Sequence, residues 1–432
     1  MKIIIALLVL SVIVIVHEFG HFLLAKKNGI TVNEFSVGMG PRLWSHQGKE
    51  TRYSLKLLPI GGSCMMLGED ETSDDPGAFN KKGVWQRISV IAAGPIFNFI
   101  LAFVVSMFFI GAIGYAVPTV TDVMSGYAAK EAGLQKGDVI TKIGSTSIDI
   151  SDDVDIYFLM NPLNGEPVDI TYERDGKEYH TSLTPKMYEK YMLGFSYAPN
   201  ASDIAIGSVT SGGSLAKAGL KAGDIINSIN GTSVTTPQDL SAYLDIHPLT
   251  SKEVMVGYNR GGKDYEVKVT PTFSSKGYTL GLTYNQYHTG RETNPVKIMK
   301  YGYYEMRYTM RMTLGSLKML VTGNVHKDDV AGPVGIVNMI GTSYESAAKI
   351  SVSAVFIQLA YIIILFSTNL GVMNLLPIPA LDGGRLVFLL IEAIRGKPVN
   401  PEKEGMVHLA GFIFLMFIMV LVMFNDISNI IH

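Results

Sequence analysis

The sequence predicts a mixed fold: a polytopic α-helical membrane protein with four transmembrane helices and a soluble α+β segment between the second and the third. Hydrophobic residues make up 47% of the 432 residues and charged residues 17%, and the mean hydropathy is +0.25. Soluble domains usually carry about 25% charged residues. Four apolar runs each approach the ~20 residues that a helix needs to cross a bilayer. Between the second and third runs, short apolar strands alternate with Gly, Asn and Asp turns.

The four runs define the expected membrane spans, which are roughly Ile3 to Leu24, Ile88 to Val117, Ser351 to Leu376 and Met406 to Phe424. We assign them to segments 1–27, 88–117, 351–384 and 406–432. The first run follows Lys2 and could be read as a signal peptide. It carries His17, Glu18 and His21 where a small-residue cleavage site would stand, so we expect it to be retained.

Basic residues set the expected orientation. Lys and Arg are frequent in segments 28–87 and 385–405 and sparse at both ends of the chain. Cytoplasmic loops carry this excess, so we expect these two loops in the cytoplasm and the outer segment and both termini on the opposite side. The formal net charge of -2 and the lack of a basic tract give no sign of a nucleic-acid partner. Cys64 is the single cysteine and cannot form an intramolecular disulfide.

The outer segment contains an internal repeat. Residues 132–140 (AGLQKGDVI) match residues 218–226 (AGLKAGDII) at an offset of 86, which is 218 minus 132. Both copies resemble PDZ domains of the circularly permuted bacterial type, placed at 118–202 and 203–273. Asp138 and Asp224 of this motif are expected to bond turn amides. The resemblance implies either a groove for an extended peptide or a size filter, and the sequence leaves both open.

His17-Glu18-Phe19-Gly20-His21 forms an H-E-x-x-H motif in the first span. Histidines at i and i+4 of a helix share one face, which suits two ligands of one zinc ion, and Glu18 beside them is placed to act as general base. In a soluble helix the motif arises by chance in many chains. Ionisable groups in a membrane span are costly unless they have a function, so chemistry is preferred to three groups that merely satisfy one another.

A catalytic zinc site usually has three protein ligands, and Asp382 is the candidate for the third. It ends the run Asn374-Leu375-Leu376-Pro377-Ile378-Pro379-Ala380-Leu381-Asp382. The two prolines end a regular helix, and irregular backbone at membrane depth is tolerated only against protein or a cavity. A helix cap at Asp382 is the alternative, but it leaves the preceding prolines unexplained.

Together, H-E-x-x-H in the first span and N-x-x-P-x-P-x-L-D-G in the third resemble the site-2 protease family, and the two PDZ-like repeats resemble its RseP group. The resemblance extends to residues 35–41, 59–62, 94–98 and 424–426. It implies Zn²⁺ bound by His17, His21 and Asp382, and a catalytic role for Glu18. It also implies substrate binding by Asn374, Pro377, Pro379, Gly61 and Gly62.

Two further segments remain open. Arg52 to Leu67 resembles a membrane-dipping β-hairpin whose edge pairs with an extended substrate, although Gly61-Gly62 could be a simple turn. Val296 to Gly323 lies in the predicted linker 274–350 and is expected to be either an amphipathic surface helix or an ordinary packed helix.

The resulting expectation is a multi-pass enzyme of the bacterial inner membrane that hydrolyses peptide bonds within transmembrane segments. The resemblance implies single-span membrane proteins as substrates, such as anti-sigma factors or remnant signal peptides. A non-catalytic PDZ-bearing scaffold is the alternative, and it would be favoured if Glu18 or a ligand were missing. A metal transporter would need more polar residues across several spans.

Overall fold

The computed structural model describes residues 2–69, 71–197, 202–323 and 331–431. These residues form two compact units. The helical unit comprises residues 1–118, 148–160 and 285–432, and the strand-rich unit comprises residues 119–147 and 161–284. Positions 198–201 and 324–330, which fall at the predicted junction of the two repeats and in the predicted linker, lie outside the described residues.

Among the described residues, four helices of the helical unit are long and apolar enough to cross a membrane, as many as the sequence predicted. They are α1 (Lys2–Lys27), α2 (Val84–Ile113), α9 (Val352–Leu375) and α11 (Pro401–Ile431). Helix α2 ends before Gly114, whose φ of 79° interrupts the helix. Glycine adopts this left-handed backbone without a steric penalty.

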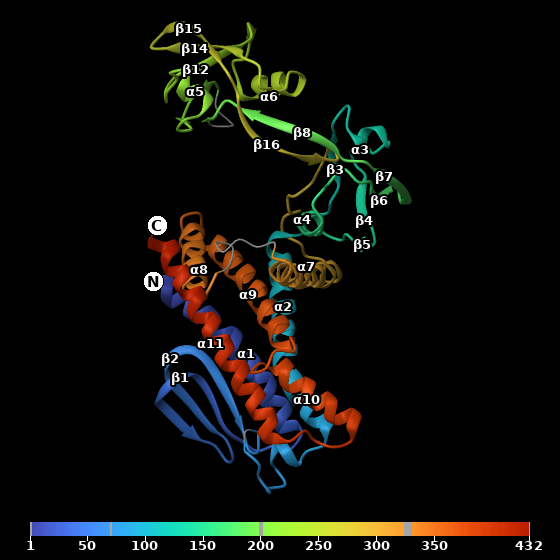
Figure 1. Ribbon diagram of the computed structural model, residues 1–432, viewed down its shortest axis with the longest axis vertical. Coiled ribbons are helices and arrows are strands. Elements are labelled where there is room, and N and C mark those ends of the chain that lie inside the picture. The colour runs from blue at the N-terminus through green and yellow to red at the C-terminus, as the bar shows by residue number, and fades with distance from the viewer. Residues whose placement is uncertain (1, 70, 198–201, 324–330, 432) are drawn as a thin grey trace. The chain divides into compact units, whose positions relative to one another are not determined.

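Helix α2 is packed between α1 and α9 (Figure 1). Glycines permit both close approaches. A Cβ atom added at Gly20 of α1 would lie 2.5 Å from the carbonyl oxygen of Ala93, and one at Gly371 of α9 would lie 3.2 Å from that of Pro95. Small residues let helix backbones approach closely in membranes. Gly20, inside the H-E-x-x-H motif, therefore allows α1 to pack closely against α2.

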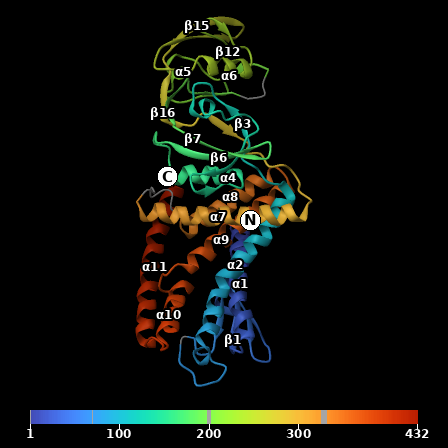
Figure 2. The ribbon, with the colours of Figure 1, turned by 90° about the vertical axis from the view of Figure 1, so that its right-hand side faces the viewer.

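Among its described residues, the helical unit also contains the α-helices α4 (Ser151–Met160), α7 (Pro295–Val321), α8 (Pro333–Ala348) and α10 (Asp382–Arg395) and the short 3-10 helix η1 (Phe79–Lys81). Helix α7 runs across α2 and α9 (Figure 2). Its packed face includes polar contacts, since Thr309 and Thr313 donate to Thr368 and Asn369 of α9, and also apolar ones, since Ile298 packs against the cluster around Phe109. Its other face exposes Val296 and other apolar residues. Helix α7 therefore has both a packed face and an exposed apolar face.

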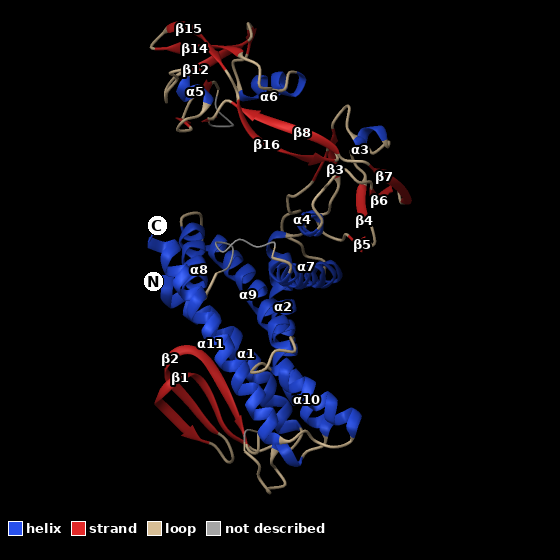
Figure 3. Ribbon diagram, in the orientation of Figure 1, coloured by secondary structure: helices blue, strands red, loops and turns tan. Residues whose placement is uncertain are grey.

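The predicted hairpin is present as β1 (Val32–Gln47) and β2 (Arg52–Met66) (Figure 3). Phe35 of β1 pairs with two separate parts of β2, with Cys64 on one side and with Tyr53 on the other. Both strands must therefore bend. The half-strands therefore lie in the order 62–66, 32–37, 52–55 and 44–47. No other described strand pairs with residues 62–66, so this half of β2 is a free edge.

The strand-rich unit contains the predicted repeat as two similar sheets, ordered β5-β4-β6-β7 and β10-β12-β14-β15 with β13 on β12. Corresponding strands of the two sheets begin 86 positions apart, as β4 and β12 do (225 minus 139). The elements are β3 (Val120–Val123), α3 (Ala128–Glu131), β4 (Val139–Ile143), β5 (Thr146–Ser147), β6 (Val168–Arg174), β7 (Lys177–Leu183), β8 (Lys186–Met192), β9 (Phe195–Ser196), β10 (Ile204–Ala205), β11 (Ser208–Val209), α5 (Ser214–Lys217), β12 (Ile225–Ile229), β13 (Thr232–Ser233), α6 (Pro237–Ile246), β14 (Val254–Arg260), β15 (Lys263–Val269), β16 (Thr272–Thr279) and β17 (Leu282–Tyr284).

The two repeats are interlocked. Strand β8, which follows the first sheet, pairs with its counterpart β16, which follows the second sheet. Strand β17 then returns to pair with β3 at the start of the first repeat, while β9 pairs with β11 at the start of the second. The first repeat is thus completed by chain that comes after the second. The predicted linker 274–350 accordingly begins inside this unit.

Candidate metal centre

The candidate metal centre begins with two histidines on one face of α1. His17 and His21 are separated by one helical turn, and both are buried. Their Nε2 atoms lie 3.2 Å apart. The i and i+4 spacing that the sequence predicted to be a pair of ligands therefore brings the two ring nitrogens together.

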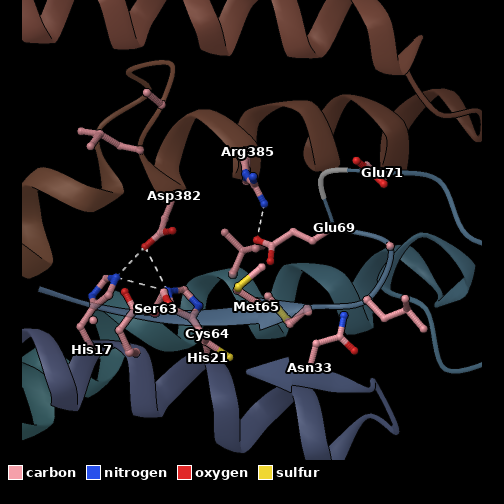
Figure 4. Close-up of a pocket in the computed structure, with 18 of the residues that line it drawn as sticks. His17, His21, Asn33, Ser63, Cys64, Met65, Glu69, Glu71, Asp382 and Arg385 are labelled. Atoms are coloured by element: carbon pink, nitrogen blue, oxygen red, sulfur yellow. Dashed lines mark hydrogen bonds and ion pairs between the residues drawn. The ribbon is translucent and has the colours of Figure 1, made fainter. Parts of the chain in front are cut away.

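Asp382 joins this pair from the beginning of α10. Its Oδ2 lies 3.1 Å from Nε2 of His17 and 3.5 Å from Nε2 of His21. The loop before it is held tightly, because Cβ atoms at Gly383 and Gly384 would lie 2.1 Å and 2.6 Å from backbone oxygens of that loop. The structure thus unites residues that are 361 positions apart (382 minus 21) (Figure 4).

The second nitrogen of each imidazole has a partner on α2. Nδ1 of His21 lies 2.9 Å from the carbonyl oxygen of Val90, so this nitrogen carries the proton. Nδ1 of His17 lies 3.1 Å from the side-chain amide of Asn98, whose Oδ1 is buried with no partner. The two ends of an amide are assigned from the hydrogen-bond network, and turning this amide over would give Oδ1 a donor in the His17 ring.

The arrangement fits a zinc ion. In neutral imidazoles protonated at Nδ1, the two Nε2 atoms are acceptors, and together with Oδ2 of Asp382 they offer three ligand atoms that face one another. Oδ2 is buried and has no hydrogen-bond donor. Zinc bonds of about 2.0–2.1 Å in a tetrahedral site place ligand atoms about 3.3 Å apart, which matches the distances of 3.1 Å, 3.2 Å and 3.5 Å.

A cavity of about 810 Å³ opens onto these three residues. Glu18 lines it beside the histidines, and Ser63, Cys64 and Met65 line it from the free edge of β2 (Figure 4). Farther along, Arg385 of α10 forms an ion pair with Glu69. The cavity therefore joins the acceptor cluster, a carboxylate and an unpaired strand edge in one space.

The predicted substrate-binding residues are distributed unevenly around this cavity. Gly62 lines it, and a Cβ at Gly62 would lie 3.1 Å from Cγ of Glu18. Asn374 lies in the last turn of α9 (Val352–Leu375), and Pro377 and Pro379 lie in the loop that leads to Asp382. These three residues and Gly61 are not among the described residues that line the cavity.

Sequence reasoning missed the roles of Asn98 and Gly94. Both belong to a segment that supported the family resemblance without an assigned role. A Cβ at Gly94 would lie 2.3 Å from Nε2 of His21 and 2.7 Å from Cε1 of His17, so only glycine leaves room for the two rings. A buried asparagine in an apolar span was the available signal for Asn98, since polar groups there usually have a function.

The family model for peptidase family M50 matches residues 5–418. The chain belongs to this family. It is 32% identical to a putative zinc metalloprotease of Clostridium acetobutylicum, over 99% of this chain and 97% of that protein. It is also 32% identical to the regulator of sigma-W protease RasP of Bacillus subtilis, over 98% and 97%, and to the probable protease eep of Enterococcus faecalis, over 98% of each.

This M50 protein is therefore a zinc metalloprotease of the site-2 type that acts within the membrane, as the sequence predicted. Its cofactor is Zn²⁺. Among solved structures, the HtrA3 PDZ domain bound to a phage-derived ligand covers 21% of this chain and 93% of that domain, at 20% identity and a TM-score of 0.18.

Proposed function

We propose that His17, His21 and Asp382 hold the zinc ion of this M50 protease and that Glu18 is its general base. The convergence of two imidazole nitrogens and a carboxylate oxygen, 3.1–3.5 Å apart, carries the proposal. Zinc bound there would polarise the scissile carbonyl and lower the pKa of the attacking water. Glu18, next to His17 and open to the cavity, takes the proton from water and returns it to the leaving amide nitrogen.

The substrate is a transmembrane segment that has unwound into an extended strand. A helical peptide bond is shielded by its own hydrogen bonds, and backbone groups in a bilayer need replacement partners. The free edge at residues 62–66 supplies them by strand addition, and this edge lines the cavity next to Glu18. Gly62 lines the cavity at this edge. Gly61, Asn374, Pro377 and Pro379 are assigned to substrate binding on the family resemblance alone, because they are not among the described residues that line the cavity.

The expected substrates are single-span membrane proteins that have already been shortened on the outer side. The name of the relative in Bacillus subtilis, regulator of sigma-W protease, supports an anti-sigma factor as one class. Remnant signal peptides are a second class. The protein would lie in the bacterial inner membrane with segments 28–87 and 385–405 in the cytoplasm. These segments carry an excess of basic residues, among them Arg87, Arg385 and Arg395, which is typical of cytoplasmic loops.

The strand-rich unit would lie outside the cytoplasm as two PDZ domains, near 118–202 and 203–273. In both, an Arg ties the Asp of the turn motif to the carbonyl of its glycine: Arg174 contacts Asp138 and Gly133, and Arg260 contacts Asp224 and Gly219. We propose that the two PDZ domains act on the outer part of the substrate, either by binding its terminal peptide or by excluding substrates with large outer domains. Substrates with outer domains of graded size distinguish these roles, because a filter responds to size and a reader to the terminal peptide.

The test replaces Glu18 by Gln in the full chain, reconstituted with a tagged single-span substrate. Cleavage should fall about 10²- to 10⁴-fold while zinc content stays at the wild-type level. His17→Ala and Asp382→Ala should lose zinc as well as cleavage. Glu50→Gln, at an exposed ion pair with Lys26, is the matched control and should cleave normally. Persistent cleavage by zinc-loaded Glu18→Gln rejects the mechanism, and no cleavage by the wild type favours the scaffold.

A further inference from the structure

Helix α11 touches the loop that precedes Asp382 at two positions on one of its faces. His408 accepts a hydrogen bond at Nδ1 from the backbone amide of Ala380, at 2.9 Å. One turn later, a Cβ at Gly411 would lie 2.5–2.8 Å from the side chain and backbone of Pro379. Residues three apart in a helix lie on the same face, so α11 contacts two consecutive loop residues with one surface.

The loop conformation needs such support. Ala380 has a φ of 78° although it is not a glycine, a backbone state that costs free energy and persists only when its surroundings enforce it. Within the loop, Ile378 N donates to Leu376 O and Leu381 N donates to Ile378 O. The amide of Ala380 donates instead to His408. Ala380 is two residues before Asp382, so a change in its φ or ψ moves the Asp382 carboxylate.

The imidazole of His408 is itself fixed in place. Because Nδ1 accepts a hydrogen bond, the neutral ring carries its proton on Nε2, and the Glu404 carboxylate lies 4.0 Å from that nitrogen. The ring also contacts Phe388 of α10, with 5.6 Å between centroids. The His408 ring therefore extends from α11 and packs against α10, the helix that begins with Asp382.

Most of α11 is exposed, although Asp426 near its end is buried and accepts hydrogen bonds from the amides of Gly332 and Gly335. Only 6% of its most apolar window is buried, against 28–33% for the other three spans. The contacts at His408 and Gly411 connect the first half of this mostly exposed helix to the loop before Asp382. They tie the position of α11 to the geometry of the metal centre.

We propose that His408 is a positioning residue for the metal centre: its Nδ1 holds the Ala380 amide, and Gly411 seats Pro379, so that Asp382 is presented to the zinc ion. This rests on the proposed assignment of Asp382 as a ligand. Removing the acceptor loosens the Asp382 carboxylate. Groups that orient metal ligands typically contribute 10- to 100-fold in metal affinity or activity.

The test uses His408→Phe, which keeps an aromatic ring but lacks the acceptor, and His408→Asn, whose Oδ1 can take the place of Nδ1. Zinc release to a chelator and the kcat and KM for a single-span substrate are measured on the full chain in detergent. His408→Phe should release zinc roughly 10- to 100-fold faster and lose kcat to a similar degree, with KM within about twofold. His408→Asn should behave like the wild type.

Gly411→Ala gives an independent variant, and should reproduce the loss because its Cβ meets Pro379. Gly405→Ala on the same helix, where a Cβ meets nothing within 4 Å, is the matched control and should change neither readout. If His408→Phe does not accumulate, Gly411→Ala carries the test. Wild-type zinc retention in His408→Phe, or equal impairment of His408→Asn, overturns the proposal. If Asp382→Ala keeps its zinc, the proposed ligand set fails as well.

Discussion

The side-chain amide of Asn98 lies 3.1 Å from Nδ1 of His17, on the side of the ring opposite Asp382. Asn98 is fully buried, and its own backbone oxygen accepts a hydrogen bond from Ser367 of α9. One residue of α2 therefore connects α9 to a ring nitrogen of α1. Such partners fix the tautomer and the orientation of a metal-binding histidine.

Replacing Asn98 by Leu should weaken zinc binding by about 10- to 100-fold, because Nδ1 of His17 loses its acceptor. Asn98→Asp should retain zinc, since a carboxylate oxygen accepts the same proton. Chelator competition on the purified protein measures both. Ser106→Ala, at a buried hydroxyl on the same helix with no hydrogen-bond partner, is the control. Wild-type affinity in Asn98→Leu would show that the amide does not orient His17.

Replacing Gly94 by Ala should abolish stoichiometric zinc binding. The new Cβ would lie 2.3 Å from Nε2 of His21 and 2.7 Å from Cε1 of His17, so both rings must move. Gly111→Ala on the same helix meets only ordinary contacts at 3.7 Å or more and should keep its zinc. Metal analysis of the two purified variants decides the matter, and a full zinc complement in Gly94→Ala contradicts the geometry.

Replacing Gly62 by Val should separate catalysis from metal binding. A Cβ there would lie 3.1 Å from Cγ of Glu18 and 3.1 Å from the carbonyl oxygen of Ser36, so the variant displaces Glu18 and leaves the histidines in place. A displacement of about 1 Å can cost on the order of 10²-fold in rate.

We therefore expect kcat to fall by about that factor at unchanged zinc content. Leu57→Ala, at an exposed position of the same hairpin, controls for general damage to β2. Concurrent loss of zinc in Gly62→Val would mean that the hairpin supports the metal centre and not Glu18 alone.

The ionisable residues of the candidate site could be predicted from the sequence, because they stand within or next to apolar spans. His17, His21 and Asp382 were identifiable because ionisable groups at membrane depth need a reason to be there. The four spans could also be predicted, because a span is recognised from the length of its apolar run alone. The offset of 86 residues identified both sheets of the strand-rich unit.

Features that depend on distant partners were not predictable. The role of Gly94 depends on two rings from another helix, and the pairing of β17 with β3 joins residues that are about 160 positions apart (282 minus 123 is 159). Helix α10 was assigned to a loop, because its apolar residues Leu386 and Leu389 acquire meaning only against the core of α1 and α2. Local sequence specifies none of these contacts.

The pH dependence of the second repeat follows from Asp224. The Arg260 guanidinium lowers the pKa of this buried carboxyl below its usual 3.8, and the amide of Lys221 also donates to it. A lowered folded-state pKa stabilises the repeat fully above the unfolded pKa, and this contribution is lost as the pH falls through the folded one. Asp224→Asn should therefore cost about 2–3 kcal/mol at pH 7 and progressively less at acid pH.

Hydrogen exchange of β12 in the full chain, corrected for intrinsic rates, measures this difference. Glu253→Gln, which alters an exposed ion pair with Lys268 at 3.7 Å, should change the exchange by less than about 1 kcal/mol. Asp138→Asn should destabilise the first repeat at pH 7, because Arg174 makes the corresponding contacts at 2.6 Å and 2.7 Å. A destabilisation by Asp224→Asn that does not shrink as the pH falls would show that the lost contact is not the ionic one.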